Sequence, residues 1–99
     1  MIVVITEAAE ADLEAIGDWI AADNPARALT FILELRDRCA ALANNPRAYP
    51  LVPRYEHTEV RRRSYRDYLI FYRIADNRME VLHVLHGARD YDLILFPED

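Results

Sequence analysis

The sequence predicts an α+β fold whose elements follow the order β-α-α-β-β-β. A mostly antiparallel sheet is expected to carry an antiparallel helical hairpin on one face. Three observations support this prediction: a β-branched run near the start, two stretches with apolar residues every three or four positions, and three later segments rich in β-branched and aromatic residues. With 99 residues, the chain is expected to form a single domain over residues 1–99.

The first strand and the first helix are predicted from the opening residues. The continuous β-branched run Ile2–Ile5 indicates a buried strand, and Thr6 is suited to cap the helix that follows. A helix over about residues 7–22 is predicted by the spacing of its apolar residues, which are Ala9, Leu13, Ile16 and Ile20. Trp19 lies beside this stripe and is expected to belong to the core.

A second helix is predicted after the break at Asp23-Asn24-Pro25, because Asn suits the cap position and Pro the first helical position. Apolar residues recur at helical spacing up to about Ala43, and Asn44-Asn45-Pro46 ends the helix. The short connection between the two helices predicts an antiparallel hairpin. Cys39 lies on the apolar face, which indicates a buried and unreactive thiol.

Three strands are predicted in the second half of the chain. A proline-containing loop over residues 44–58 comes first, and its apolar residues should hold it against the body of the protein. The strands cover about Glu59–Ser64, Tyr68–Ile74 and Met79–His86, with a hairpin turn at 76–78. The middle strand is apolar or aromatic on both faces and should be central, with both sides covered. Residues 90–99 are expected to form a short tail.

Positive charge is concentrated in one part of an acidic chain, whose net charge is −5. Residues 47–73 carry seven arginines against three acidic residues, a balance of +4, whereas residues 1–46 and 74–99 have balances of −5 and −4. The chain contains no lysine, and arginine is the better residue for bidentate contacts with carboxylates and phosphates. The overall acidity argues against binding to long duplexes, so specific nucleic-acid binding is not expected.

The sequence does not support a secreted or membrane protein, an intramolecular disulfide, or a metal or cofactor site. The apolar opening residues are too few for a secretory signal, and no stretch approaches the roughly 18 apolar residues of a membrane helix. A cytoplasmic protein without membrane contact is therefore expected, and its single cysteine excludes an intramolecular disulfide. His83 and His86 are three positions apart on a strand and should point to opposite faces, so no metal site and no cofactor are predicted.

The last two strands resemble a known family. The sequences YLIFYRI at Tyr68–Ile74 and VLHVLHGARD at Val81–Asp90 are similar to the "YxIxYR" strand and the "VLHGARD" end of ParE-type toxins in the RelE/ParE superfamily. Arg61 matches the arginine that usually opens the preceding strand, and the breaks at 23–25 and 45–46 match those around the second helix. The resemblance covers nearly the whole chain in the same element order, which implies a RelE/ParE-like fold.

This resemblance implies the toxin of a bacterial type II toxin–antitoxin module, of the kind that stabilises plasmids. A ParD-like antitoxin encoded beside the toxin would neutralise it, often in a hetero-oligomer, by wrapping a C-terminal segment around the helical hairpin and the sheet. The ParE branch is associated with inhibition of DNA gyrase, whereas the RelE branch cuts mRNA on the ribosome. Two departures matter: His83 stands where the family often carries arginine, and the hairpin before Tyr68 differs in length from the nuclease branch, whose catalytic residues are therefore not transferred.

The run Arg61-Arg62-Arg63, with Arg66, allows two interpretations. It is either solvated charge on a strand edge, which also discourages edge pairing, or a contact for an acidic antitoxin segment or target surface. Alternation places Arg61 and Arg63 on one face of the sheet and Arg62 on the other, so the three cannot serve one site.

Candidates for contact with the target or the antitoxin are Arg61, Arg63, Arg73, His83, His86, Arg89, Asp90 and Trp19. Some also have a structural interpretation: His86 could hydrogen-bond the loop that leads to Arg89, and Arg89 with Asp90 could form a local salt bridge. Trp19 would mark a partner surface if part of the helical stripe stayed exposed. Tyr91 offers a phenol, but no nucleophile or carboxylate is placed beside either histidine, so no catalytic residue is assigned.

The sequence therefore supports a toxin that binds DNA gyrase as a protein partner and has no active site of its own. The alternative is a ribosome-dependent mRNA endoribonuclease of the RelE type, in which arginines would stabilise phosphate charge and a His or Tyr would act as acid or base. A small interaction domain without toxicity is the third interpretation, since a fold does not fix a function.

Overall fold

The computed structural model describes residues 1–97 and confirms the predicted order of elements. Strand β1 (Ile2–Ile5) leads into helices α1 (Glu7–Ala21) and α2 (Pro25–Ala41), and strands β2 (Arg61–Tyr65), β3 (Tyr68–Ala75) and β4 (Arg78–His86) follow. Short helical turns are η1 (Leu42–Asn44), η2 (Glu56–Thr58) and α3 (Asp92–Leu95). The predicted tail is therefore partly helical, and its residues 98 and 99 lie outside the described residues.

The four strands form a mixed sheet in the order β1-β4-β3-β2. β1 runs parallel to β4, whereas β4, β3 and β2 are joined by antiparallel pairs, so the mostly antiparallel sheet is confirmed. The register shifts between Phe71 and Tyr72, which pair with His83 and Val81. Leu82 is therefore an extra residue in β4, and the strand bulges at this point.

Helices α1 and α2 both begin with an N-cap hydrogen bond to the residue that the sequence predicts. Thr6 Oγ1 accepts the Ala9 N–H at the start of α1, and Asn24 Oδ1 accepts the Arg27 N–H at the start of α2. α2 is α-helical to Ala41 and then tightens into η1, close to the predicted end. None of the helices within residues 1–97 is long and apolar enough to cross a membrane.

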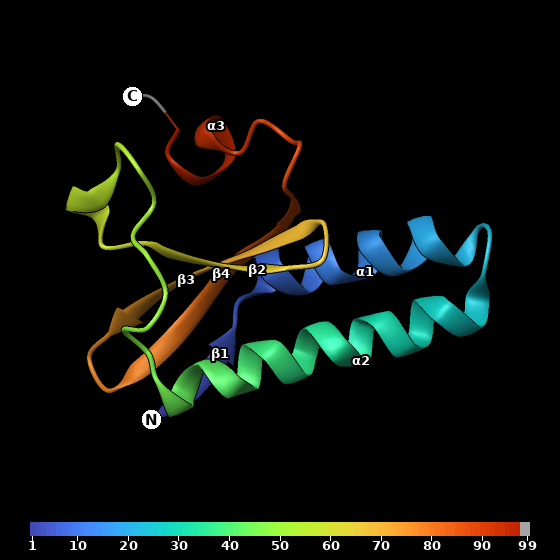
Figure 1. The fold of residues 1–99 in the computed structure, drawn as a ribbon, viewed down its shortest axis with the longest axis horizontal. Helices are drawn as coiled ribbons and strands as arrows, with labels where there is room; N and C mark the ends of the chain where they lie inside the picture. The colour runs from blue at the N-terminus through green and yellow to red at the C-terminus, as the bar shows by residue number, and fades with distance from the viewer. Residues whose placement is uncertain (98–99) are drawn as a thin grey trace.

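The helical hairpin covers one face of the sheet (Figure 1). The core between the hairpin and the sheet consists of Ala9, Leu13, Ile16, Phe31, Leu35, Cys39, Leu42, Ile70, Tyr72, Met79, Val81 and Val84. Cys39 is fully buried, as predicted, and burial raises the pKa of its thiol to about 11, which makes the reactive thiolate rare. The buried Tyr72 hydroxyl donates to Pro46 O at 2.6 Å, so the predicted packing of the long loop against the body is confirmed.

A second apolar cluster covers the other face of β3, which is central with both sides covered, as predicted. The loop before β2 and the segment after β4 supply most of it (Figure 1): Tyr55 stacks on Phe96 at 4.1 Å, and the Tyr91 ring lies 4.8 Å from Phe71. The fully buried members of this cluster are Val52, Val60, Phe71 and Leu85.

The prediction that Ile2–Ile5 forms a buried strand is wrong. β1 is an edge strand: Val3 and Ile5 pack against the helix-side core, whereas Ile2 is 71% exposed and Val4 is also exposed. The second cluster contains no residue of β1, so the outer face of this strand stays uncovered. β2 begins at Arg61 rather than at the predicted Glu59, because Glu59 adopts the left-handed backbone region, with a φ of 63°.

Candidate functional site

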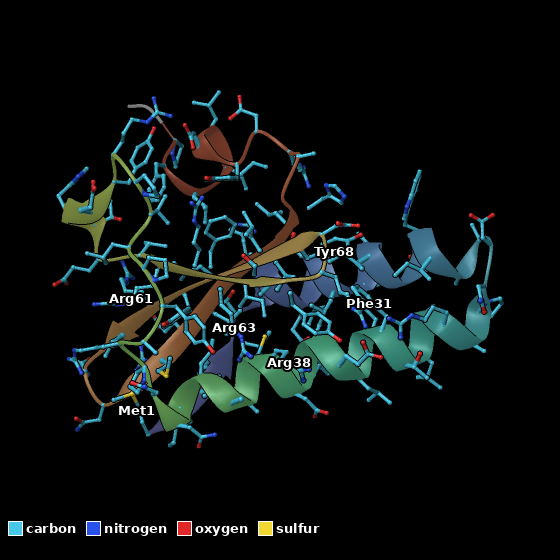
Figure 2. The ribbon with its side chains drawn as sticks, in the orientation of Figure 1. Met1, Phe31, Arg38, Arg61, Arg63 and Tyr68 are labelled. Atoms are coloured by element: carbon cyan, nitrogen blue, oxygen red, sulfur yellow. The ribbon has the colours of Figure 1, made fainter. Side chains whose placement is uncertain are left out.

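The helical hairpin projects beyond the end of the sheet (Figure 1). A groove, here called the Trp19 groove, lies beside this projection. Two adjoining hollows of about 370 and 470 Å³ form it and share Trp19, Tyr68 and His86. Figure 2 shows Tyr68 at the end of the β2–β3 hairpin, beside Phe31 of α2. The other lining residues are Asp12, Ala15, Ile16, Val84, Leu85 and Arg89 in the first hollow and Ile20, Arg27, Phe31, Arg66 and Asp67 in the second.

Trp19 is 78% exposed, so the prediction that it belongs to the core is wrong. The buried residues of α1 end at Ile16, and the last turns of the helix run past the end of the sheet, where no strand is available to cover an indole (Figure 1). The exposed indole thus forms a wall of the groove. Large exposed aromatic groups beside a hollow are typical of surfaces that bind another protein.

The floor of the groove is built by aromatic contacts between the sheet and α2. Tyr68 and His86 pair across β3 and β4, and their rings meet edge to face at 5.3 Å. The Phe31 ring lies 5.5 Å from that of Tyr68, and burial raises the pKa of the Tyr68 hydroxyl. The Ala88 N–H donates to His86 Nδ1 at 3.1 Å, which confirms that His86 holds the loop leading to Arg89.

The charged rim contains both paired and unpaired arginines. Arg27 Nη1 lies 2.6 Å from Glu34 Oε2 on the same helix, and the Tyr65 hydroxyl also donates to Glu34. The hydrogen bond from Arg27, followed by the one from Tyr65, lowers the pKa of Glu34 from 4.5 to about 2. Arg66 and Arg89 form no ion pair with any residue of 1–97, so two guanidinium groups at the rim keep their charge available.

The lowered pKa of Glu34 predicts how the free energy of unfolding changes as the pH falls. Because the folded pKa is below the unfolded value, the stabilisation is fully present above about pH 4.5 and is lost as the pH falls toward 2. Glu34→Gln should therefore destabilise the protein at neutral pH, and its difference from the wild type should shrink between those two pH values. Urea unfolding of both proteins across this pH range measures the difference. Glu14→Gln removes an exposed carboxylate of α1 as the control, and an equal, pH-independent loss in both variants would contradict the assignment.

Asp12 and His83 form a structural contact at the bulge of β4. Asp12 Oδ2 accepts the Val84 N–H at 2.9 Å and lies 2.8 Å from His83 Nδ1. The expectation that no carboxylate lies beside either histidine is therefore wrong for His83, because α1 packs along the edge of β4 and brings Asp12 to it. The Asp12 carboxylate thus occupies the edge of β4 beyond the point where pairing with β1 ends, at Val81. The register places His83 opposite Phe71 and His86 opposite Tyr68, which pack on opposite faces of the sheet, so the predicted separation of the two histidines is confirmed.

The structure does not bring the remaining candidates into the groove. Arg61 donates to the carbonyl oxygens of Arg47 and Tyr49, whereas Arg63 donates to that of Arg38. Arg73 faces its cross-strand partner Glu80 with a nitrogen–oxygen distance of 3.5 Å. Asp90 is exposed, and within residues 1–97 neither it nor Arg89 forms the predicted local salt bridge.

The phenol of Tyr91 lies on the opposite side of the sheet from the groove. Arg62 Nη1 donates to the Tyr91 hydroxyl at 2.7 Å, and the Tyr91 ring packs in the second cluster against Phe71. Arg62 therefore faces away from Arg61 and Arg63, as the alternation of the strand predicts. His86 and Tyr91 belong to different surfaces.

Sequence reasoning missed Asp12 and Phe31 as residues of the site. Asp12 carries no signal in a single sequence, because an acidic residue on a surface helix is ordinary. Phe31 lies beside the apolar stripe of the second helix, and this position does not indicate that its ring borders an open groove. The position of Trp19 was a usable signal, since it lies one residue off the stripe that ends at Ile20.

Comparison with known proteins gives the class of the molecule. The family described as "ParE toxin of type II toxin-antitoxin system, parDE" matches residues 3–91. A solved chain from the chromosomal ParDE toxin–antitoxin system of P. aeruginosa shares the fold, with a TM-score of 0.76, 21% sequence identity, and coverage of 87% of this chain and 95% of that one. No curated protein matches the chain. The class is thus the toxins of type II toxin–antitoxin systems, and within it this chain belongs to the ParE family.

Proposed function

We propose that this ParE-family toxin binds DNA gyrase as a protein partner and inhibits it, and that a ParD-like antitoxin neutralises the toxin. The family match supports the proposal, as does the origin of the similar P. aeruginosa chain in a ParDE system. The observation that carries it is the Trp19 groove, an open hollow with an apolar floor, a charged rim and an exposed indole. The toxin would act in the bacterial cytoplasm, where gyrase works, and would form a hetero-oligomer when neutralised.

The Trp19 groove is suited to the antitoxin because it combines the two features of a protein interface. Its floor offers Ile16, Phe31 and Tyr68 to apolar anchor residues, which gain free energy when they leave water. Its rim offers the unpaired guanidinium groups of Arg66 and Arg89, which can bind carboxylates. An amphipathic segment of another protein matches both features.

The positions of the basic and phenolic groups give less support to mRNA cleavage. That reaction needs an acid, a base and a cation around one phosphate group. Here Tyr91 lies with Arg62 on the other side of the sheet from His86. The phenol that the groove does place beside His86 is that of Tyr68, and burial raises its pKa, which makes it a weaker acid. The Arg61 guanidinium already donates to the carbonyl oxygens of Arg47 and Tyr49, which leaves it fewer donors for a phosphate.

The test is a supercoiling assay with purified toxin, purified gyrase and relaxed plasmid. We expect inhibition that rises with toxin concentration and disappears when antitoxin from the adjacent reading frame is added in equal amount. A toxin sample unfolded by heat serves as the control for nonspecific effects. Expression of the toxin alone should stop growth, and coexpression of the antitoxin should restore it.

Two results would contradict the proposal. Site-specific cleavage of mRNA in a translation extract, with normal supercoiling, would assign the chain to the ribosome-dependent nucleases instead. Normal growth at good expression, with no effect on either gyrase or mRNA, would indicate an interaction domain without toxicity.

A further inference from the structure

An arginine–tyrosine seam, defined by Arg38, Arg63, Arg66, Tyr49 and Tyr65, lies between α2 and the outer strand β2. The guanidinium carbons of Arg38 and Arg66 lie 4.6 and 5.8 Å from the centre of the Tyr65 ring. That of Arg63 lies 4.9 Å from the centre of the Tyr49 ring. Figure 2 shows Arg38 and Arg63 near each other in the space between α2 and the sheet. Stacking on the rings orders the guanidinium groups, so less entropy is lost when they bind an anion.

The guanidinium groups of the seam keep most of their hydrogen-bond donors. Arg63 donates one bond, to the Arg38 carbonyl oxygen at 3.2 Å. The side chains of Arg38 and Arg66 donate to no acceptor within residues 1–97, and none of the three arginines forms an ion pair there. Each guanidinium has five N–H groups in a fork that fits a carboxylate or a phosphate. The seam therefore presents ordered positive charge with free N–H donors.

Glu34, a carboxylate that contacts the seam, is paired mainly with Arg27 and only more weakly attracted by Arg66. Glu34 accepts from the Tyr65 hydroxyl, but its other contacts are the two hydrogen bonds from Arg27, at 2.6 and 3.3 Å. Arg27 and Glu34 thus cancel each other's charge. The positive charges of the three seam arginines remain, in a chain whose net charge is −5.

Carboxylates of a polypeptide fit the seam better than a nucleic acid does. Nucleic-acid grooves combine basic residues with open aromatic faces on which bases stack. Here guanidinium groups already lie over the rings of Tyr49 and Tyr65, so these faces are taken. The acidic stretches 1–46 and 74–99 would also repel a long phosphate chain. A short acidic peptide needs no open ring face, and it is short enough to contact the seam without lying along the acidic stretches.

The seam continues into the Trp19 groove. Arg66 belongs to both, and Phe31, which lines the groove, lies 5.9 Å from the Tyr65 ring. We propose that the seam binds a row of carboxylates in the same antitoxin segment whose apolar residues fill the Trp19 groove. This inference rests on the proposed function, and it predicts an acidic stretch directly adjoining the apolar anchors in the antitoxin sequence.

The test compares the Arg38→Gln/Arg66→Gln toxin with the wild type in its affinity for purified antitoxin. We expect the Kd to rise about tenfold at low salt, and the difference to shrink at high salt because exposed charges are screened. Gyrase inhibition by the free variant is measured in parallel, because Arg66 also lies at the rim of the Trp19 groove. Arg47→Gln/Arg54→Gln removes the same charge from exposed loop positions outside the seam and should leave the Kd within about twofold.

Two further variants separate lost charge from lost structure. Arg38→Lys/Arg66→Lys keeps the charge without the fork and should recover part of the affinity. Circular dichroism shows whether each variant folds. If the double variant does not fold, Arg66→Gln alone provides the same comparison, because Arg66 lies in the exposed β2–β3 turn.

Several outcomes would overturn the inference. An unchanged Kd in the folded seam variant, with the wild type bound normally, removes the seam from the interface and leaves the proposed function intact. Lost gyrase inhibition with unchanged antitoxin affinity would show that the seam contacts the target instead. Binding of labelled oligothymidylate that disappears in the seam variant, without a change in antitoxin affinity, would make it a nucleic-acid site. A wild-type toxin that neither binds antitoxin nor inhibits gyrase would refute the proposed function and this inference together.

Discussion

Replacing Trp19 with alanine is expected to weaken antitoxin binding by about thirtyfold, while the free energy of unfolding changes by less than about 0.5 kcal/mol. The indole is 78% exposed in the free toxin, so it contributes little to the core, yet it lines both hollows of the groove. Truncating an aromatic residue at the centre of an interface costs about 2 kcal/mol, which corresponds to this loss of affinity. Calorimetry with antitoxin and urea unfolding of the free toxin measure the two quantities.

Leu29→Ala is the matched control for Trp19. Leu29 is 66% exposed on α2 but lines neither hollow of the groove. Its removal should leave both the affinity and the stability unchanged. Equal losses of affinity in the two variants would mean that general apolar surface, rather than the groove, holds the antitoxin. A loss of stability above about 2 kcal/mol in the Trp19 variant would mean that the indole is part of the core after all.

Phe71→Ala is expected to lower the free energy of unfolding by about 3–5 kcal/mol. Phe71 is fully buried on the face of β3 that points away from the helices, where the second cluster forms around it. The Tyr91 ring packs 4.8 Å from it, so the cavity would loosen the segment after β4 as well as the strand. Domains of ordinary stability have only about 5–15 kcal/mol in total, so the variant would be marginal. Urea unfolding measures the loss.

Leu93→Ala provides the comparison for Phe71. Leu93 is exposed on α3, within the segment that covers the second cluster. Its removal should change the stability by less than about 0.5 kcal/mol. A loss below about 1 kcal/mol in the Phe71 variant would contradict the conclusion that this second cluster is a true part of the core.

The order and the approximate bounds of the elements could be predicted because local signals agree with the final packing. Thr6 and Asn24 cap the helices in the structure as their positions in the sequence indicate. The apolar residues on both faces of β3 correctly placed this strand at the centre of the sheet. The exposure of the outer face of β1 could not be predicted, because a β-branched run looks the same whether one or both of its faces are covered.

The candidate site was harder to predict because it depends on distances between elements. The sequence shows that α1 is long, but not that the sheet ends before the helix does. Trp19 is exposed because it lies in the projecting part of the helix and off the stripe that packs against the core. His86 was correctly assigned to holding the loop that follows it, since that contact is local. The stacking of Arg38 on Tyr65 joins residues of α2 and β2, and nothing in their separate sequence neighbourhoods indicates it.

The most direct test of a protein-docking groove uses the fact that the chain contains one tryptophan. Toxin labelled with 5-fluorotryptophan gives a single ¹⁹F resonance, which reports Trp19 alone, even in a complex with unlabelled antitoxin. We predict that the resonance moves on binding and loses its sensitivity to exchange of H₂O for D₂O, because the indole becomes buried. An unchanged, solvent-sensitive resonance in a complex whose formation is verified by size-exclusion chromatography would contradict the role of the groove.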